Sequence, residues 1–320
     1  MLPTTTNFFA AALTFLLNLL LTKARLNAPL SDFPTLKYGT AWKKENTPDL
    51  VYNAVKAGFR HIDTACQPKH YNEAGVGEGW TRAAQELGLS RGDISLQTKF
   101  TSLNGQDPNR VPYDKNAPLE ERVRQSLEKS LENLQTDYID SLVMHGMENT
   151  WEDNFVVWRV FESFVDEGRV GQIGISNFYD ADAVKYLFQN ARIKPAVVQN
   201  RFYRESGYDT EIRSFCRENG IEYQSFWTLG ANRHLLRNEE VAEFCQEKQL
   251  TPETFMYAFV MALGITPLDG TTNRDHMAED IALLRRVRDG EELFTSEDLI
   301  MFAEILGIPN FELDEDEEEL

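Results

Sequence analysis

The chain has 320 residues, 42% of them apolar, which is enough to bury a large hydrophobic core. Its net charge of −19 argues against a nucleic-acid partner, because an acidic surface repels phosphate backbones. The three cysteines, Cys66, Cys216 and Cys245, are odd in number and lack C-x-x-C spacing. They are therefore predicted to be free thiols in a reducing compartment, with neither a disulfide framework nor a zinc site.

The two ends of the chain differ from its middle. Residues 8–21 form an apolar run that is short for a membrane span of ~20 residues and has the length of a signal-peptide h-region. Three interpretations of residues 1–28 stay open: a short membrane anchor, a cleaved secretory leader, or an apolar extension packed on the protein. Residues 309–320 are mostly Asp and Glu and are predicted to form a disordered acidic tail. We expect a cytoplasmic protein, with membrane contact through residues 8–21 as an alternative.

Between residues 29 and 308, short apolar or β-branched runs alternate with segments of helical period. The strand candidates are residues 35–40, 60–65, 94–99, 140–146, 171–176, 196–200, 221–227 and 264–270. The helix candidates are residues 48–57, 118–134, 151–166, 180–189, 209–218, 239–246 and 275–286. Strands that alternate with helices in this way predict an α/β fold, a (β/α)8 TIM barrel formed by a single domain. A doubly wound sheet is the alternative.

Polar side chains recur at the carboxyl ends of successive predicted strands. Asp63, Lys99 and His145 end the second, third and fourth strands, and Gln199 ends the sixth. Because the chemistry of such a barrel takes place at the carboxyl ends of its strands, we expect these side chains to meet in one site. Packing can explain each residue alone, as a surface lysine or a satisfied core histidine, but it does not explain the set.

These residues lie in motifs that resemble those of the aldo-keto reductase superfamily, over about residues 34–285. GFRHIDTA with NEAGVGEGW resembles the family's second-strand signature, LQTKF its third strand, LVMHG its fourth and IGISNF its fifth. The resemblance implies reduction of an aldehyde or ketone by NAD(P)H, with a catalytic tetrad of Asp, Tyr, Lys and His. Asp63, Lys99 and His145 match three members of that tetrad.

The tyrosine of the tetrad does not map directly, because the segment from Asp63 to Asn72 is two residues longer than the family pattern. Alignment on Asn72 and Glu73 places His70 in the tyrosine position, whereas the chemistry favours Tyr71. A phenol has a reference pKa of ~10 and is protonated at neutral pH, so it can donate the proton that a reduced carbonyl oxygen must receive. We expect Tyr71 to be the donor and keep His70, with a reference pKa of ~6.5, as the alternative.

The resemblance assigns a supporting role to each remaining member of the tetrad. Asp63 would keep Lys99 charged and in place, Lys99 would ease proton release from the phenol, and His145 would hydrogen-bond the carbonyl. Trp42 falls where family members often place an aromatic wall of the substrate pocket. The mechanism requires no metal, and the sequence shows no cluster of metal ligands.

The resemblance also implies a nicotinamide cofactor that binds in extended form across the barrel mouth. Ser176, Asn177 and Gln199 would hold its carboxamide, and Phe226 would stack under its ring, where family members usually have a tyrosine. At the eighth strand, the lysine that many NADP-preferring members use for the 2′-phosphate is absent. The residues expected near the phosphates instead are Gly270, Thr271, Arg274 and His276. We expect NADPH to be the cofactor, with NADH as the alternative.

The segment GVGEG at residues 75–79 is similar to the G-x-G-x-x-G dinucleotide fingerprint but does not fulfil it. Trp80 stands where a glycine would follow, and no predicted strand leads directly into the segment. We interpret these glycines as turn and helix-start residues.

The C-terminal segment is short and poor in aromatic residues, which favours a small or varied aldehyde or ketone as the small-molecule partner. We expect a monomer. Two other functions stay open: a regulatory or channel-associated subunit that binds the cofactor with little turnover, and a different barrel enzyme such as a phosphate-binding isomerase. Turnover of aldehydes would argue against the first, and tight cofactor binding against the second.

Overall fold

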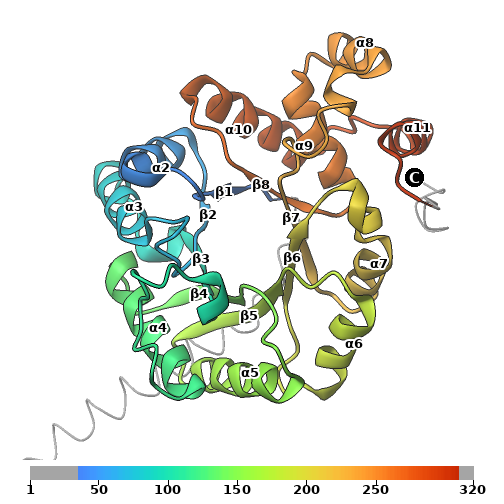
Figure 1. Cartoon of the computed structure of the whole chain (residues 1–320). Helices are drawn as coiled ribbons and strands as arrows, with labels where there is room; N and C mark the ends of the chain where they lie inside the picture. Colours follow the sequence, from blue (N-terminus) through green and yellow to red (C-terminus); the bar gives the residue numbers. More distant parts are fainter. Residues whose placement is uncertain (1–34, 310–320) are drawn as a thin grey trace, which may run out of the picture.

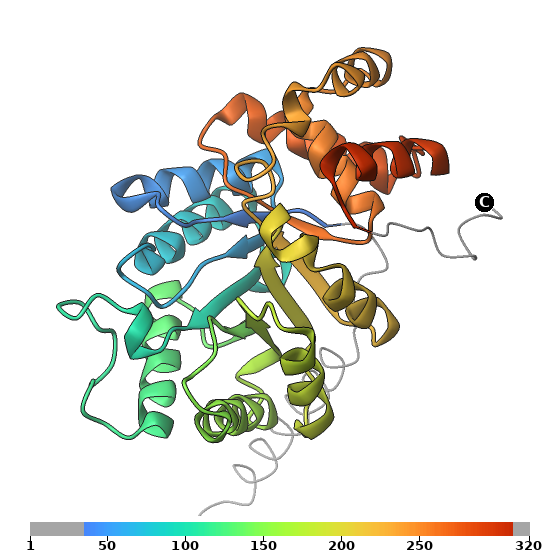
Figure 2. The same ribbon diagram turned by 45° about the vertical axis from the view of Figure 1, so that its right-hand side comes forward.

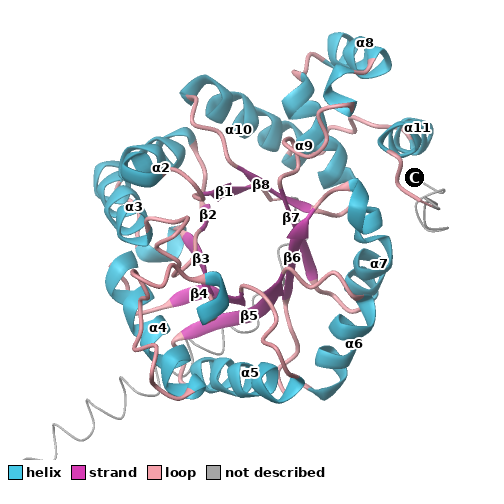
Figure 3. Cartoon of the chain, in the orientation of Figure 1, coloured by secondary structure: helices cyan, strands magenta, loops and turns pink. Residues whose placement is uncertain are grey.

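A computed structural model describes residues 35–309 as a closed barrel of eight parallel strands in chain order, with helices around it (Figures 1 and 3). The strands are β1 (Lys37–Gly39), β2 (His61–Asp63), β3 (Ser95–Phe100), β4 (Ile139–Met144), β5 (Val170–Ser176), β6 (Val197–Arg201), β7 (Glu222–Phe226) and β8 (Thr266–Asp269). Strand β1 pairs with both β2 and β8, which closes the barrel. The predicted (β/α)8 fold is confirmed.

The helices of the described residues follow or flank the strands. They are α2 (Thr47–Ala57), α3 (Glu73–Leu87), α4 (Leu119–Leu134), α5 (Trp151–Asp166), α6 (Ala181–Asn190), α7 (Thr210–Glu218), α8 (Glu239–Lys248), α9 (Pro252–Ala262), α10 (Arg274–Arg288) and α11 (Ser296–Leu306). Each predicted strand and helix coincides with an observed one. Helices α3, α9 and α11 were not predicted.

The predicted leader (1–28) lies outside the described residues, and so does all but the first residue of the predicted tail (309–320). The predicted location, cytoplasmic with membrane contact through residues 8–21, is wrong as far as the described residues go. Within residues 35–309, no helix is long and apolar enough to cross a membrane.

The sequence pattern explains which helices were predictable. In α4, Val123, Leu127 and Leu134 recur at helical spacing and are buried against the barrel, while the rest of the helix is largely charged. Helix α9 has no such contrast, because every residue from Thr254 to Met261 is buried. A helix that is apolar all round gives no amphipathic period, so α9 escaped prediction.

Helices α8, α9 and α11 pack together on one side of the barrel (Figure 2). Phe302 of α11 lies edge-on to Phe255 of α9, with ring centroids 4.7 Å apart, and to Phe244 of α8 at 5.1 Å. Such aromatic pairs contribute more than their buried area alone. This contact between distant segments, rather than local pattern, holds the C-terminal helix.

The glycines of residues 75–79 lie in the first two turns of α3, so they are helix-start residues as predicted but not turn residues. Asn72 caps the helix by accepting the N–H of Gly75 at 3.0 Å. A Cβ on Gly77 would lie 2.1 Å from the carbonyl oxygen of Asn133 in α4, and one on Gly79 2.5 Å from that of Pro48 in α2. The glycines therefore let three helices approach closely.

We predict that Gly77→Ala destabilises the protein by about 1–3 kcal/mol, although alanine favours a helix interior by ~1 kcal/mol. The reason is that the new methyl group meets backbone, which cannot rotate away. Thermal or denaturant unfolding would measure the change. Gly92→Ala is the control, because its Cβ meets nothing closer than 3.7 Å. An equal midpoint for parent and Gly77→Ala would contradict this packing.

Candidate active site

A cavity of about 970 Å³ lies at the carboxyl ends of the barrel strands. Most of the predicted site residues line it: Trp42, Asp63, His70, Tyr71, His145, Ser176, Asn177, Gln199, Phe226, Gly270, Thr271 and His276. Lys99 is fully buried and does not line the cavity itself, but its Nζ atom donates to Asp63, which does. Arg274 is exposed at the start of α10 and does not line the cavity.

Asp63 at the end of β2 and Lys99 in β3 form a buried ion pair. The Lys99 Nζ atom donates to both carboxylate oxygens of Asp63, at 2.7 and 2.6 Å, and to the carbonyl oxygen of Thr64 at 2.8 Å. The two side chains are 1% and 3% exposed. Burial lowers the pKa of Lys99, and the Asp63 carboxylate opposes that shift. These three acceptors leave the ammonium group no freedom to move.

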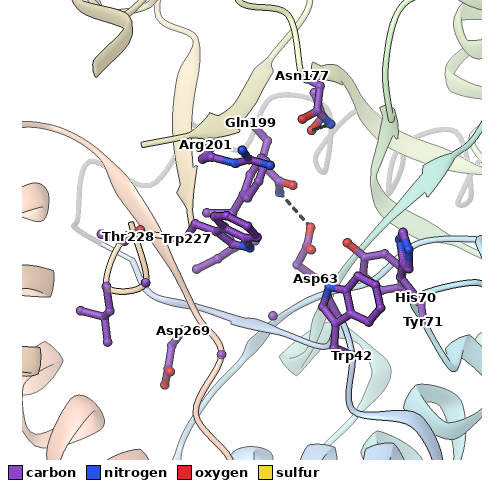
Figure 4. A pocket seen from close by; sticks show the side chains of 18 of the residues that line it. Trp42, Asp63, His70, Tyr71, Asn177, Gln199, Arg201, Trp227, Thr228 and Asp269 are labelled. Atoms are coloured by element: carbon purple, nitrogen blue, oxygen red, sulfur yellow. Dashed lines mark hydrogen bonds between the residues drawn. The ribbon is translucent and has the colours of Figure 1, made fainter. Parts of the chain in front are cut away.

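Glutamine side chains fill the barrel interior below this pair. Gln97 and Gln199 each donate through Nε2 to Oδ1 of Asp63, at 2.7 and 2.9 Å (the bond from Gln199 is drawn in Figure 4). The same two Nε2 atoms reach Oε1 of Gln224, at 2.7 and 2.9 Å. Gln97 and Gln224 were not predicted, although both occupy inward positions of strands two residues from another polar side chain. Gln97 fixes the carboxylate of Asp63 directly, and Gln224 fixes it indirectly by accepting from both donors.

The two neighbouring proton donors after β2 point to different surroundings (Figure 4). The ring of Tyr71 lies 5.5 Å from Lys99 Nζ and edge-on to the His145 ring, with centroids 6.0 Å apart. His70 instead stacks on Trp42, with centroids 4.0 Å apart. The cavity thus brings Tyr71, rather than His70, next to the ion pair.

Burial, and secondarily the Asp63 carboxylate, raises the pKa of Tyr71 well above its usual value. No hydrogen bond within the described residues involves its hydroxyl group. The phenol therefore stays protonated over the physiological pH range and is available to a ligand in the cavity.

His145 is held in one orientation by residues from neighbouring strands. Its Nδ1 atom lies 2.6 Å from Oγ1 of Thr101, and its carbonyl oxygen accepts the side-chain amide of Asn177 at 2.8 Å. Tyr113 in turn fixes Thr101 by donating to its carbonyl oxygen at 2.7 Å. Burial, and then the charge of Lys99, lowers the pKa of His145 to about 3. The imidazole is therefore neutral at physiological pH, with Nε2 left for a ligand.

The residues predicted to hold a carboxamide are placed together but are not equally available. Asn177 already donates to His145 and accepts from the Tyr179 hydroxyl at 3.2 Å. Gln199 has committed its amide N–H groups and keeps only Oε1 as an acceptor. The Ser176 hydroxyl can still donate, and the ring of Phe226 lines the cavity. This end of the cavity fits a flat amide-bearing ring.

A turn after β7 offers backbone donors that the sequence did not reveal. Thr228, Leu229 and Gly230 line the cavity, and no hydrogen bond of the described residues involves their N–H groups. Successive backbone N–H groups of this kind form a cradle for anions. Arg233 lines the cavity just beyond them and adds a positive charge. The turn therefore fits a diphosphate.

Two further cations near the mouth were also missed. Lys43, just after Trp42, is buried and donates from Nζ to the carbonyl oxygen of Gly270 at 2.8 Å, which ties the β1 loop to the β8 loop. Arg201 ends β6 and lies 4.1 Å from the Trp227 ring centroid. Within residues 35–309 it forms no ion pair with a carboxylate. Its place two residues after Gln199, on the inward face of the strand, was the available signal.

The chain matches the family model described as "Aldo/keto reductase family" over residues 35–297. It is 31% identical to glyoxal reductase of Bacillus subtilis (strain 168) over 234 residues, which cover 72% of this chain and 75% of that protein. It is 33% identical to NAD(P)H-dependent D-xylose reductase of Pachysolen tannophilus over 182 residues, 49% of this chain and only 52% of that protein.

The fold is also similar to a solved structure, that of an aldo-keto reductase enzyme from a Medee basin deep-sea metagenome library. The TM-score is 0.70 at 23% sequence identity, over 88% of this chain and 97% of that one. At this identity the likeness concerns the fold.

Proposed function

The chain belongs to the aldo/keto reductase family of NAD(P)H-dependent oxidoreductases, and on that premise we propose that it reduces an aldehyde or ketone to an alcohol with Tyr71 as the acid. The substrate is a small-molecule carbonyl compound whose reacting group sits between Tyr71 and His145. The expectation of a monomer stays a prediction.

The cavity residues fit the cofactor in two places. When bound, the reduced nicotinamide supplies the hydride that the carbonyl carbon receives. Phe226, Ser176 and Oε1 of Gln199 would hold the ring and its carboxamide beside Tyr71. The N–H groups of residues 228–230, with Arg233, would hold the diphosphate.

Each member of the tetrad has one task in this proposal. His145, neutral and held through Nδ1 by Thr101, donates from Nε2 to the carbonyl oxygen and fixes its position. Tyr71 gives its proton to that oxygen as negative charge develops there. Lys99 stabilises the tyrosinate that results, and Asp63 keeps Lys99 in place and charged.

One observation supports the proposal most strongly: a phenol without a hydrogen-bond partner among the described residues lies between a fixed ammonium group and a fixed neutral imidazole. Tyr71 is partly buried and lines the cavity, so its free hydroxyl faces space that a ligand oxygen can occupy. Core packing alone would not bring these three groups together at the end of a barrel.

The test is oxidation of NADPH and NADH by the purified protein against a panel of aldehydes and ketones, followed by the absorbance of the reduced cofactor. We expect turnover of at least one small aldehyde. Cofactor binding without turnover on any carbonyl compound would contradict the proposal and favour a regulatory subunit. Absence of binding by either dinucleotide would contradict any cofactor-dependent function.

A further inference from the structure

Carboxyl groups dominate the end of the cavity that is formed by β8, α9 and α10. Asp269 at the end of β8 (Figure 4), Asp280 in α10 and Glu253 in α9 all line it. Asp269 is 0% and Asp280 3% exposed, so neither carboxyl group is solvated by bulk water. Exposed carboxylates are expected in a chain with a large excess of acidic residues. Two neighbouring carboxyl groups that are both buried need an explanation, because acidic side chains are rarely buried.

The contacts of Asp269 leave one of its oxygens available to a proton shared with Asp280. Oδ1 accepts the N–H of Thr271 at 2.7 Å and the hydroxyl of Tyr257 at 3.2 Å. Oδ2 is buried and receives no hydrogen bond from the described residues, and a protonated Asp280, whose carboxyl interacts with that of Asp269, can supply the hydrogen. Burial raises the pKa of both carboxyl groups; the neighbouring Asp269 raises that of Asp280 further, to about 9, whereas the hydrogen bond with Asp280 opposes the rise at Asp269. The pair therefore carries about one negative charge near neutral pH.

The cations nearby do not cancel this charge on the cavity side. Lys43 faces Asp269 but is directed at the carbonyl oxygens of Gly270 and Thr271, and burial lowers its pKa to about 8. Arg274 is exposed and does not line the cavity, and His276, which does, is exposed as well. Nothing here resembles the cluster of arginine and lysine that binds a phosphate dianion.

The position of the pair in the cavity decides which part of a dinucleotide it would meet. If the nicotinamide lies beside Tyr71 and Phe226, and the diphosphate at residues 228–230, the adenosine half must occupy the remaining part of the cavity. That part is bounded by β8 and the start of α10, where Asp269 and Asp280 lie. This placement rests on the function proposed above.

We propose that Asp269 and Asp280 select NADH over NADPH. A shared carboxyl pair can hydrogen-bond the free hydroxyl groups of the adenosine ribose, acting as both donor and acceptor. The same pair repels a 2′-phosphate, which brings two negative charges into a poorly solvated site. The proposed preference for NADH is the reverse of the preference for NADPH expected from the sequence. The sequence shows that the lysine at the eighth strand is absent, but the burial of the two acids is visible only in the structure.

Equilibrium binding of NADH and NADPH to the full chain, measured by calorimetry or by quenching of tryptophan fluorescence, tests the proposal. We expect NADH to bind on the order of tenfold more tightly or better, the effect of a single repulsive contact of ~1.4 kcal/mol. Asp269→Asn combined with Asp280→Asn keeps hydrogen-bonding side chains of the same shape and removes the negative charge of the pair. It should tighten NADPH binding and narrow the ratio of the two dissociation constants.

Glu279→Gln is the matched control, because it also removes one negative charge, next to Asp280 but at an exposed position outside the cavity lining. It should leave the ratio unchanged. Asp269→Asn alone is the second variant if the double variant does not fold. Equal or tighter binding of NADPH by the parent protein overturns the proposal, as does an equal response to Glu279→Gln. If neither dinucleotide binds, the proposed function itself fails, which is a separate result.

Discussion

Replacing Tyr71 with phenylalanine is expected to reduce the kcat for carbonyl reduction by about 10²–10⁴-fold, the usual contribution of a positioned general acid. The substitution removes only the hydroxyl group, so the ring keeps its contacts with Lys99 and His145. Cofactor affinity should therefore stay the same. Steady-state kinetics with a substrate from the panel, together with the dissociation constant of NADH, would separate the loss of chemistry from a loss of binding.

His70→Ala is the matched comparison, because it changes the adjacent residue that the family alignment favours. His70 packs on the exposed Trp42 and not on the Lys99–Asp63 pair, so we expect partial activity, with a change mainly in KM. Full activity in Tyr71→Phe, or a larger loss in His70→Ala, would move the acid to His70. The loop lengthened by two residues after Asp63 would then have a different conformation from the one in the structure.

The sequence predicted the parts of this molecule that local pattern determines. Eight strands, seven helices and the meeting of Asp63, Lys99 and His145 at one barrel end followed from periodicity and strand ends. The choice between His70 and Tyr71 could not be made in this way, because it depends on the path of a loop relative to β3 and β4. Spacing alone left both residues as proton donors.

Contacts between distant segments account for what the sequence did not show. The acceptor role of Gln224, more than a hundred residues from Gln97, requires knowledge of the strand order and register around the closed barrel. The Asp269–Asp280 pair joins a strand end to the second turn of a helix, and the burial of both acids is visible only in the folded chain. The anion cradle at residues 228–230 consists of backbone groups, which carry no sequence signal.

Replacing Lys99 with methionine is expected to abolish carbonyl reduction and also to destabilise the fold. The variant would leave the carboxylate of Asp63 buried without its cation, which costs ~3–5 kcal/mol in comparable pairs. Without the ammonium group the tyrosinate of Tyr71 loses its stabilising charge, so kcat should fall at least as far as in Tyr71→Phe. Thermal unfolding and single-turnover kinetics would report the two effects separately.

A double variant distinguishes the catalytic task of the pair from its structural one. Asp63→Asn combined with Lys99→Met removes both charges and keeps an amide that can still accept from Gln97 and Gln199. We expect it to recover much of the lost stability but none of the activity. Lys56→Met, which breaks the exposed pair with Glu86, should change the stability little and leave turnover unchanged. Activity that returned together with stability would show that the pair only supports the barrel, because a group that acts on Tyr71 cannot be replaced by a neutral side chain.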